Sequence, residues 1–369
     1  MNLRIVITGG GTGGHLFPGI ALATGLQERL DGCRVLFIGT PRQLDKQALA
    51  GYDFKQETIQ CMGLKGMGWL HRLRSVVQLP AATLEAGRIL KKFAPQLVFG
   101  VGGYVTGPVL LAARLRSIPV CIHEQNSVPG LANRMLSLIA DRIFLSLPCR
   151  HRFPRGRTML VGNPVRKEIL AAADAPPRRT GEEKIIFILG GSQGAHRVNM
   201  LMIDAAENLI REYPRVRFIH QTGRADADAV RARYQAMGAE AEVSDFFRDM
   251  AQLYARADLA VSRAGATTLA ELAVMGVPAL LIPYPYAADD HQRTNALHYE
   301  AGGGAVMLPE QELSGGRLAG EIVKLMRTPA TLEGMSVKMK KMARPDAAER
   351  IIEACLELVS AKSGGNHGS

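Results

Sequence analysis

The sequence has few cysteines, few aromatic residues and no long apolar run, and these shortages exclude several classes of protein. The five cysteines among 369 residues are scattered, odd in number and never spaced as CxxC, which argues against a disulfide framework and against a zinc site. No apolar run approaches the roughly 20 residues that span a bilayer. The chain also begins in strand-like residues, without a charged leader and apolar signal core. We therefore expect a cytoplasmic protein with reduced thiols.

Acidic residues are scarce in only one part of the chain. Residues 1–165 contain 20 Lys and Arg but 8 Asp and Glu, whereas residues 166–369 contain 25 and 26. The net charge of +11 therefore comes from the first part. Such a basic region suits nucleic acid, an anionic membrane surface or a polyanionic substrate, and charge alone does not choose among them.

Short apolar runs alternate with helical stretches along most of the chain. The expected strands are residues 4–8, 34–38, 96–99, 120–123, 142–145, 159–161, 184–189, 217–220, 259–262 and 279–282. This alternation predicts an α/β protein with two Rossmann-like, doubly wound domains that face a central cleft. We expect domains at 1–166 and 167–345, with a linker at 171–183 where Pro, Ala and charged residues gather. Residues 346–369 are expected to form an amphipathic helix, roughly 346–358, and a disordered tail at 360–369.

Residues 258–278, DLAVSRAGATTLAELAVMGVP, predict a buried strand followed by a helix. Gly265 permits the turn, Thr267 or Thr268 is expected to cap the helix, and Gly276 ends it. A helix that starts after a parallel strand points backbone N–H groups at the sheet's carboxyl edge, which suits a phosphate. Arg263 and Glu271 flank this point and suit a negative charge and a sugar diol. The alternative is an ordinary strand-turn-helix unit.

Glycine-rich loops follow three of the expected strands. Residues 6–15, VITGGGTGGH, align without gaps on residues 187–196, FILGGSQGAH, and a third loop lies at 100–107. These loops indicate close approaches of the backbone to a ligand. The first satisfies GxGxxG, so a dinucleotide-binding oxidoreductase is an alternative. The acidic residue that such enzymes place after the second strand is missing, because that strand ends in residues 37–40, FIGT.

Several polar residues are candidates for chemistry. His15 stands at a helix start, where the dipole favours a neutral ring that can accept a proton, although a capping role is also open. Residues 123–126, HEQN, close a strand with four polar side chains, among which Glu124 suits a base and Asn126 a hydroxyl partner. Asp226 and Asp228 have the DxD spacing of metal-dependent sugar transfer. Their place at a helix start favours pairing with the helix dipole instead.

Residues 61–92 combine apolar residues, cations and the single tryptophan of the chain. Trp69, Leu70 and Leu73 interleave with Lys65, Arg72 and neighbouring cations. The segment is either a helix packed on the core or an interfacial membrane contact. We favour contact with an anionic membrane over nucleic acid, because no recognised nucleic-acid motif is present.

Six segments together resemble the MurG family of bacterial glycosyltransferases, glycosyltransferase family 28. They are GGGTGGHLFPG at 9–19, GGYVTGP at 102–108, HEQN at 123–126, GNPVR at 162–166, GGSQGA at 190–195 and SRAGATTLAE at 262–271. They occur in the family's order across nearly the whole chain. The resemblance implies a GT-B fold with an N-terminal acceptor domain, a C-terminal donor domain and a final helix that crosses back to the first domain. It implies transfer of N-acetylglucosamine (GlcNAc) from UDP-GlcNAc to lipid I, with inversion, to give lipid II.

The resemblance also implies the residues of the site. His15 is expected to be the catalytic base, with Glu124 as the second candidate. The implied UDP-GlcNAc contacts are Thr12, Gly13, Gly14, Asn126, Arg166, Ser192, Phe247, Arg263, Ala266, Thr267, Thr268, Leu269, Ala270, Glu271 and Gln292. Gly103 and Tyr104 are expected on the acceptor side, and Trp69, Leu70 and Leu73 at the membrane.

The implied reaction requires no cofactor and no bound metal, since the glycine loop and the helix dipole would stabilise the departing diphosphate. The expected partners are UDP-GlcNAc, lipid I, the anionic inner-membrane surface and other proteins of cell-wall synthesis, without nucleic acid. The protein would lie peripherally on the cytoplasmic face of the membrane. Two alternatives are another UDP-sugar enzyme of the same fold, such as a UDP-GlcNAc 2-epimerase, and an inactive scaffold that recruits cell-wall proteins.

Overall fold

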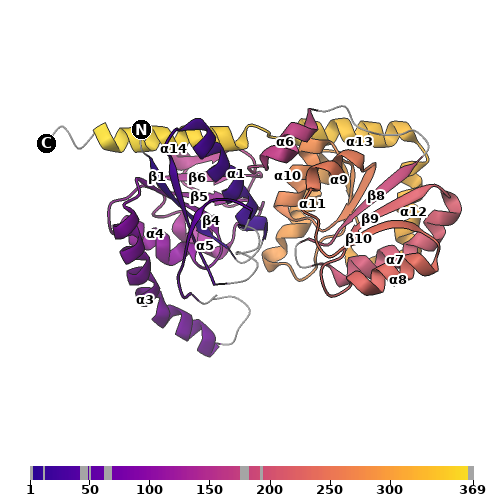
Figure 1. Ribbon diagram of the computed structural model, residues 1–369, viewed down its shortest axis with the longest axis horizontal. Coiled ribbons are helices and arrows are strands. Elements are labelled where there is room, and N and C mark those ends of the chain that lie inside the picture. Colours follow the sequence, from indigo (N-terminus) through magenta and orange to yellow (C-terminus); the bar gives the residue numbers. More distant parts are fainter. Residues whose placement is uncertain are drawn as a thin grey trace. The chain divides into compact units, whose positions relative to one another are not determined.

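The computed structural model consists of two compact α/β units (Figure 1). It describes residues 3–10, 13–41, 49, 51–61, 69–174, 183–191 and 194–364. Unit 1 comprises residues 1–166 and 345–369, and unit 2 comprises residues 167–344. Each unit has its own parallel sheet, so the predicted pair of Rossmann-like domains is confirmed.

The sheet of unit 1 has the strand order β3-β2-β1-β4-β5-β6-β7, and every neighbouring pair is parallel. The strands are β1 (Arg4–Gly9), β2 (Arg34–Gly39), β3 (Lys55–Thr58), β4 (Leu97–Gly102), β5 (Val120–Glu124), β6 (Arg142–Leu145) and β7 (Thr158–Leu160). β3 was not among the expected strands. Its four residues, KQET, are all exposed at the sheet edge, so no apolar pattern marks them.

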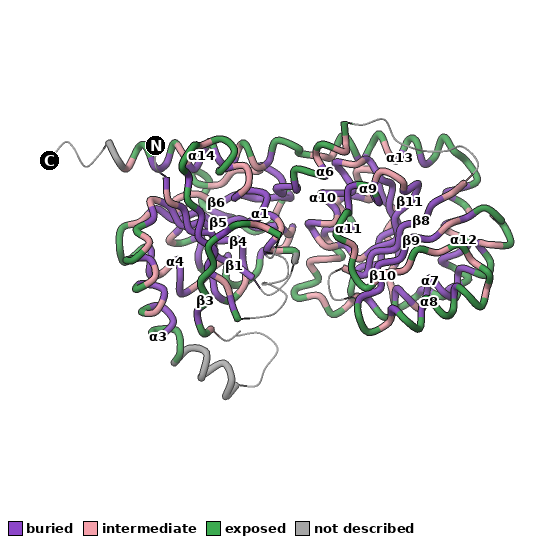
Figure 2. Tube along the Cα trace, in the orientation of Figure 1, coloured by how far each residue is buried: buried purple, intermediate pink, exposed green. Residues whose placement is uncertain are grey.

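Helices cover both faces of this sheet. They are α1 (Gly13–Arg29), α3 (Trp69–Phe93), α4 (Thr106–Arg114), α5 (Leu131–Leu136) and α14 (Ala347–Gly364). Alternate strand residues point to opposite faces, so Ile5 and Ile7 pack with α1 and α14, while Val6 and Ile38 pack with α3, α4 and α5. Figure 2 shows the result, with buried strands between helices whose outer sides are exposed.

Unit 2 repeats the plan with the parallel strand order β10-β9-β8-β11-β12-β13. The strands are β8 (Lys184–Leu189), β9 (Val216–Gln221), β10 (Glu240–Ser244), β11 (Leu259–Ser262), β12 (Ala279–Leu281) and β13 (Ala305–Met307). β10 and β13, the two edge strands, were also missed in the sequence. One is mostly polar and the other has three residues.

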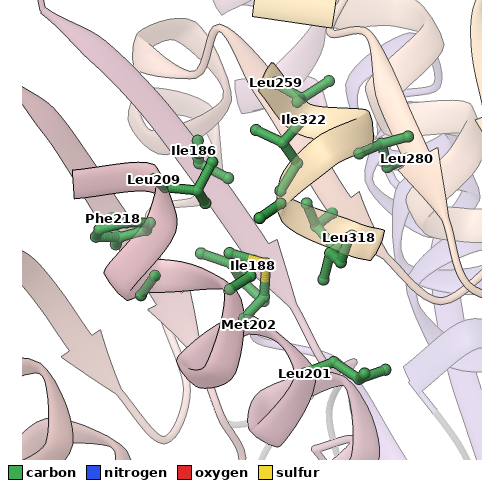
Figure 3. Close-up of a cluster of buried hydrophobic side chains, with 14 of the residues drawn as sticks. Ile186, Ile188, Leu201, Met202, Leu209, Phe218, Leu259, Leu280, Leu318 and Ile322 are labelled. Carbon is green, nitrogen blue, oxygen red and sulfur yellow. The ribbon is translucent and has the colours of Figure 1, made fainter. Parts of the chain in front are cut away.

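The helices of unit 2 enclose a large apolar core. They are α6 (Lys167–Ala173), α7 (His196–Glu212), α8 (Ala227–Ala236), α9 (Met250–Arg256), α10 (Ala266–Met275), α11 (His291–Ala301), α12 (Gly315–Met326) and α13 (Pro329–Met342). Figure 3 shows Ile186 and Ile188 of β8 among side chains of α7 and α12, such as Met202 and Leu318. On the other face, the ring of Phe187 meets Tyr254 of α9.

The end of the chain returns to unit 1. α14 packs against α1 and buries Ile351, Ile352 and Leu358 in the core of that unit. The helix runs to Gly364, so the tail expected to be disordered from residue 360 is helical in its first part, and residues 365–369 lie outside the described residues. Residues 171–173, expected in the linker, belong to α6, which packs on α9 and α10.

The strand orders locate where each unit binds ligands. In unit 1 the direction of winding reverses between β1 and β4, and in unit 2 between β8 and β11. Ligands of such sheets bind at the carboxyl ends of the strands beside this reversal. The glycine loops at residues 9–14, 102–107 and 190–195 all follow these strands.

Candidate active site

Glycines let β1 and β4 of unit 1 approach each other at their carboxyl ends. A Cβ at Gly103 would lie 2.5 Å from the carbonyl oxygen of Gly10, and Gly103 has a positive φ of 91°. A Cβ at Gly102 would lie 2.9 Å from Nδ1 of His15. The loop therefore admits no side chain at these two positions, and the His15 ring packs directly on backbone.

A chain of hydrogen bonds leads from His15 into the core of unit 1. Nδ1 of His15 lies 3.0 Å from Oε1 of Gln125, whose Nε2 donates to the carbonyl oxygen of Val101 at 2.8 Å. Gln125 Nε2 also lies 3.2 Å from Nδ1 of His123. His123 is fully buried, and burial is the main cause that lowers its pKa to about 4. The His123 ring is therefore neutral at pH 7.

Glu124 holds the loop that follows β5. Its Oε1 accepts from the backbone N–H and the side-chain amide of Asn126, at 3.0 and 3.2 Å. Its Oε2 accepts from the backbone N–H of Gly130 at 3.0 Å and from Asn133 at 2.8 Å. The carboxylate is 2% exposed. These contacts make Glu124 an acceptor that fixes the loop from β5 to α5.

The other expected residues of unit 1 lie near the start of α1 or on the loops. Gly13 and Gly14 begin α1, whereas Thr12 lies outside the described residues. Arg166 is buried, with its guanidinium 4.7 Å from the ring centre of Phe17 on α1. Tyr104 is exposed within the glycine loop at 102–107.

In unit 2, α10 starts directly after β11 as expected, but without the expected cap. Gly265 is the N-cap residue, and no side chain caps the helix, so the prediction that Thr267 or Thr268 does so was wrong. A helix leaves its first N–H groups without partners inside the helix, and they carry a partial positive charge. At the other end Gly276, with a φ of 65°, ends α10 as predicted.

The α10 residues that are expected to contact the donor differ in how far their side chains are exposed. Thr268 and Ala270 are partly exposed, whereas Ala266, Thr267 and Leu269 are buried. The N–H of Leu269 donates to the carbonyl oxygen of Gly265 at 3.0 Å. The N–H of Leu269 is thus used within the helix, and the residues before it in the first turn are the ones whose N–H groups suit a ligand.

Glu271 and Arg263 have partners that the sequence did not reveal. Glu271 is 4% exposed and accepts a hydrogen bond of 2.9 Å from the hydroxyl of Tyr254. Arg263 forms a largely buried ion pair with Glu310 and donates to the carbonyl oxygen of Ile282 at 3.0 Å. This ion pair balances much of the charge of Arg263 within the protein.

Phe247 and Gln292 are placed by backbone contacts. The N–H of Phe247 donates to Gln221 at 3.1 Å, and the ring of Phe247 lies edge-on to Phe187. Gln292 accepts from the N–H of Tyr284 at 3.0 Å, which ties α11 to the loop after β12. Ser192 lies outside the described residues.

The DxD pair is not assembled into one cluster. Asp226 accepts from His196 at 2.9 Å and from Asn199 at 2.7 Å, whereas Asp228 pairs with Arg231. Burial raises the pKa of Asp226, but the hydrogen bonds from His196 and Asn199 outweigh it and the pKa is lowered. Asp226 is the N-cap residue of α8, as its place at a helix start predicted.

The expected membrane segment is described only in part. Residues 62–68 lie outside the described residues, and Trp69, Leu70 and Leu73 belong to α3 without described side chains. Within the described ranges, none of the helices is both long and apolar enough to cross a membrane.

Sequence reasoning missed four residues of these networks: His123, Gln125, Asn133 and Tyr254. The run HEQN gave a signal for the first two, because four polar residues end a buried strand. Asn133 and Tyr254 carry no such signal in the sequence, because their roles come only from hydrogen bonds to Glu124 and Glu271, which lie elsewhere in the chain.

Comparisons with known proteins cover nearly the whole chain. Residues 5–145 match the glycosyltransferase family 28 N-terminal domain, and residues 185–351 match the family's C-terminal domain. A curated relative from Desulfotalea psychrophila is 44% identical over 97% of both chains. Its name is UDP-N-acetylglucosamine--N-acetylmuramyl-(pentapeptide) pyrophosphoryl-undecaprenol N-acetylglucosamine transferase.

Solved structures agree on the fold. The crystal structure of Acinetobacter baumannii MurG matches with a TM-score of 0.77 and 32% identity, over 96% of this chain and 99% of that one. A putative UDP-N-acetylglucosamine 2-epimerase from Listeria monocytogenes matches with a TM-score of 0.71 but 14% identity, over 96% of both chains, which shows a shared fold alone. The chain is a GT-B enzyme that belongs to glycosyltransferase family 28.

Proposed function

We propose that this protein transfers GlcNAc from UDP-GlcNAc to the C4 hydroxyl of the muramyl sugar of lipid I, which gives lipid II for peptidoglycan synthesis. The observation that carries the proposal is the 44% identity, over 97% of both chains, to a relative named for this transfer. The two glycine loops, His15 and the start of α10 supply the groups that the reaction needs.

Unit 2 binds the donor in this proposal. The start of α10 receives the diphosphate, because its N–H groups and partial charge suit an anion. Glu271 accepts hydrogen bonds from the ribose hydroxyls, and the Tyr254 hydroxyl fixes its carboxylate. Phe247 lies beside the uracil, with Ser192 and Gln292 as further contacts. Arg263 supports the loop after β12 rather than the phosphate, since Glu310 neutralises it.

Unit 1 supplies the catalytic base and binds the acceptor. An inverting transfer needs a group that takes the proton from the attacking hydroxyl. His15 is that group, because it is partly exposed in the first turn of α1 and held by Gln125. Glu124 is a positioning residue, because both of its oxygens already accept hydrogen bonds. Gly103 and Tyr104 lie on the acceptor side, whereas Gly13, Gly14, Asn126 and Arg166 are further donor contacts in this proposal.

The chemistry is a single displacement. The C4 oxygen bonds to the anomeric carbon, the bond from that carbon to the diphosphate breaks, and the proton passes to His15. UDP leaves with the additional negative charge, which the dipole of α10 stabilises.

Contact with the membrane is the second part of the proposal. α3, α4 and α5 cover one face of the sheet of unit 1, and large apolar residues on or after each of them are exposed: Leu84, Leu115 and Leu138. Lys91, Lys92 and Arg116 are exposed on the same elements. Apolar side chains beside cations suit an anionic lipid surface at the cytoplasmic face, with Trp69, Leu70 and Leu73 at the start of α3.

The transfer is tested by incubating the protein with UDP-GlcNAc, with and without a lipid I analogue, and measuring UDP and the sugar product. UDP release only with the acceptor, and labelled GlcNAc in the lipid product, supports the proposal. An epimerised UDP-sugar formed without acceptor would instead point to a 2-epimerase. Binding of UDP-GlcNAc without any turnover would favour the scaffold.

The membrane contact is tested by flotation with anionic liposomes. The double substitution Leu115→Ser and Leu138→Ser is expected to reduce the bound fraction several-fold. Val337→Ser is the matched control, because Val337 is an exposed apolar residue of α13 in unit 2. Equal binding of the unsubstituted protein, the double variant and Val337→Ser would contradict the proposal that this surface contacts the membrane.

A further inference from the structure

The hydrogen bonds behind His15 have a direction that the atom types determine. The carbonyl oxygen of Val101 can only accept, and it lies 2.8 Å from one end of the Gln125 side-chain amide. That end must therefore be the Nε2 donor. The opposite end, which lies 3.0 Å from Nδ1 of His15, is then Oε1, which can only accept. Nδ1 of His15 consequently carries the hydrogen.

The same reasoning assigns His123. Gln125 Nε2 has a second hydrogen, which points at Nδ1 of His123 at 3.2 Å, so this nitrogen accepts. The Nε2–H of His123 is then directed at the carbonyl oxygen of Gly162 at 3.1 Å and the hydroxyl of Ser146 at 2.9 Å. Every donor in the chain from Gly162 to His15 meets an acceptor.

We propose that Gln125 and His123 are positioning residues that hold His15 as its Nδ1–H tautomer and so leave the lone pair on Nε2 to take the acceptor's proton. The tautomer of a histidine is set by the hydrogen bond of its other nitrogen. The opposite tautomer would present an N–H to the attacking hydroxyl and could not accept its proton. The catalytic part of this inference rests on the proposed function, whereas the tautomer does not.

Close packing and burial make the arrangement rigid. The His15 ring packs on Gly102, where a Cβ would lie 3.1 Å from Cε1, so the ring cannot be displaced toward β4 without contact with backbone. Gln125 and His123 are both buried, at 2% and 0% exposure. A buried amide that lost its partners would remain unsatisfied, which opposes rotation of Gln125.

The tautomers are measured directly by NMR of protein labelled with 15N-histidine, with the signals assigned by comparison with His15→Ala. The expected result is His15 with hydrogen on Nδ1 and His123 with hydrogen on Nε2. Hydrogen on Nε2 of His15 in the unsubstituted protein would overturn the proposal, whether or not the protein transfers GlcNAc.

The role in turnover is tested with Gln125→Met, which keeps the length of the side chain and removes its hydrogen bonds to His15, Val101 and His123. We expect a mixture of His15 tautomers and a kcat about 10- to 100-fold lower, a smaller loss than the roughly 10²- to 10⁴-fold contribution of a whole general base, with an unchanged KM for UDP-GlcNAc. Gln125→Glu keeps an acceptor for Nδ1–H and should restore the tautomer and part of kcat. An unchanged His15 tautomer in Gln125→Met would contradict the proposal.

Asn199→Leu is the matched control. Asn199 is a fully buried amide of unit 2 whose oxygen lies 3.1 Å from Nε2 of His220 and whose nitrogen donates to the carbonyl oxygen of Thr222. Asn199→Leu should destabilise the protein about as much as Gln125→Met does, but leave the NMR signals of His15 and kcat unchanged. A wild-type protein with the Nδ1–H tautomer but no transfer would reject the proposed function and keep the positioning role.

Discussion

Two histidines at aligned positions of the two glycine loops have different surroundings. His15 in unit 1 packs on Gly102 and meets the neutral amide of Gln125. His196 in unit 2 begins α7 with 74% of its side chain exposed, and it meets the carboxylate of Asp226. The aligned segments therefore give one partly buried ring that contacts an amide and one exposed ring that contacts a carboxylate.

The partner of each ring explains the difference. An amide orients a neutral ring without adding charge, which suits a group that must accept and release a proton. A carboxylate stabilises a positive ring and holds it in place, and Asp226 is itself used to begin α8. We infer that unit 1 carries the proton transfer, whereas the loop of unit 2 serves donor binding.

The largest expected difference between the two loops lies in turnover. His15→Ala should lower kcat by about 10²- to 10⁴-fold, the usual contribution of a general base. His196→Ala should stay within about twofold, because the ring is largely exposed and such a surface contact with a carboxylate contributes little. Initial rates of transfer at saturating donor measure both. A loss of kcat in His196→Ala that matches the loss in His15→Ala would remove the distinction.

The buried histidines of the two units predict a loss of stability in acid. Burial lowers the pKa of His123 to about 4 and that of His220 to about 3. Since the unfolded rings titrate near 6.5, stability is complete above that pH and is lost as the pH falls from 6.5 toward these lower values. The loss is on the order of 3 kcal/mol for His123 at 1.36 kcal/mol per unit, and larger for His220.

Urea unfolding at several pH values measures this loss. His220→Gln should flatten the pH dependence for unit 2, and His123→Gln should do so for unit 1. A pH dependence that neither substitution changes would show that other groups cause the acid sensitivity.

Substitution of two glycines in the unit 2 loop distinguishes the cost of a left-handed backbone from the cost of a steric overlap. Gly191 and Gly194 have positive φ values of 78° and 80°. A Cβ at Gly191 meets nothing within 4 Å, whereas one at Gly194 would overlap the carbonyl oxygen of Thr222. Gly191→Ala should cost about 1–2 kcal/mol for its left-handed conformation, and Gly194→Ala clearly more. Thermal unfolding compares them, and equal losses would contradict the close approach of the loop to β9.

A further expected effect concerns donor binding by the carboxylate in unit 2. Glu271→Gln removes the charged acceptor of the proposed hydrogen bonds from the sugar hydroxyls. A hydrogen bond to a charged group contributes about 1.5–3 kcal/mol. The KM for UDP-GlcNAc should therefore rise about 10- to 100-fold, with a smaller rise in Tyr254→Phe, which removes only the supporting hydroxyl. A lower kcat with an unchanged KM for either variant would move Glu271 from binding to chemistry.

The sequence predicted the central strands well because they are buried on both faces and form continuous apolar runs, as in residues 184–189. It missed β3 and β10, whose residues lie at sheet edges and carry polar side chains. It found the glycine loops and the end of α10 at Gly276, since these follow from backbone conformation.

The sequence could not reveal contacts between distant residues. His15 and Gln125 are 110 positions apart, and only the adjacency of β1, β4 and β5 brings them together. Likewise, nothing in the pattern around Arg263 indicated that Glu310 would neutralise it. The glycine loops and the end of α10 were thus predictable from local motifs, whereas the partners of His15 and Arg263 required the fold.

The division of roles between the units is tested most directly by calorimetric titration of UDP-GlcNAc into the wild-type protein, His15→Ala and Glu271→Gln. We predict the wild-type Kd for His15→Ala, even though its transfer is lost, and a Kd about 10- to 100-fold weaker for Glu271→Gln. Loss of donor binding in His15→Ala with full binding in Glu271→Gln would contradict the account, because it would place the donor on unit 1 and leave unit 2 without its proposed role.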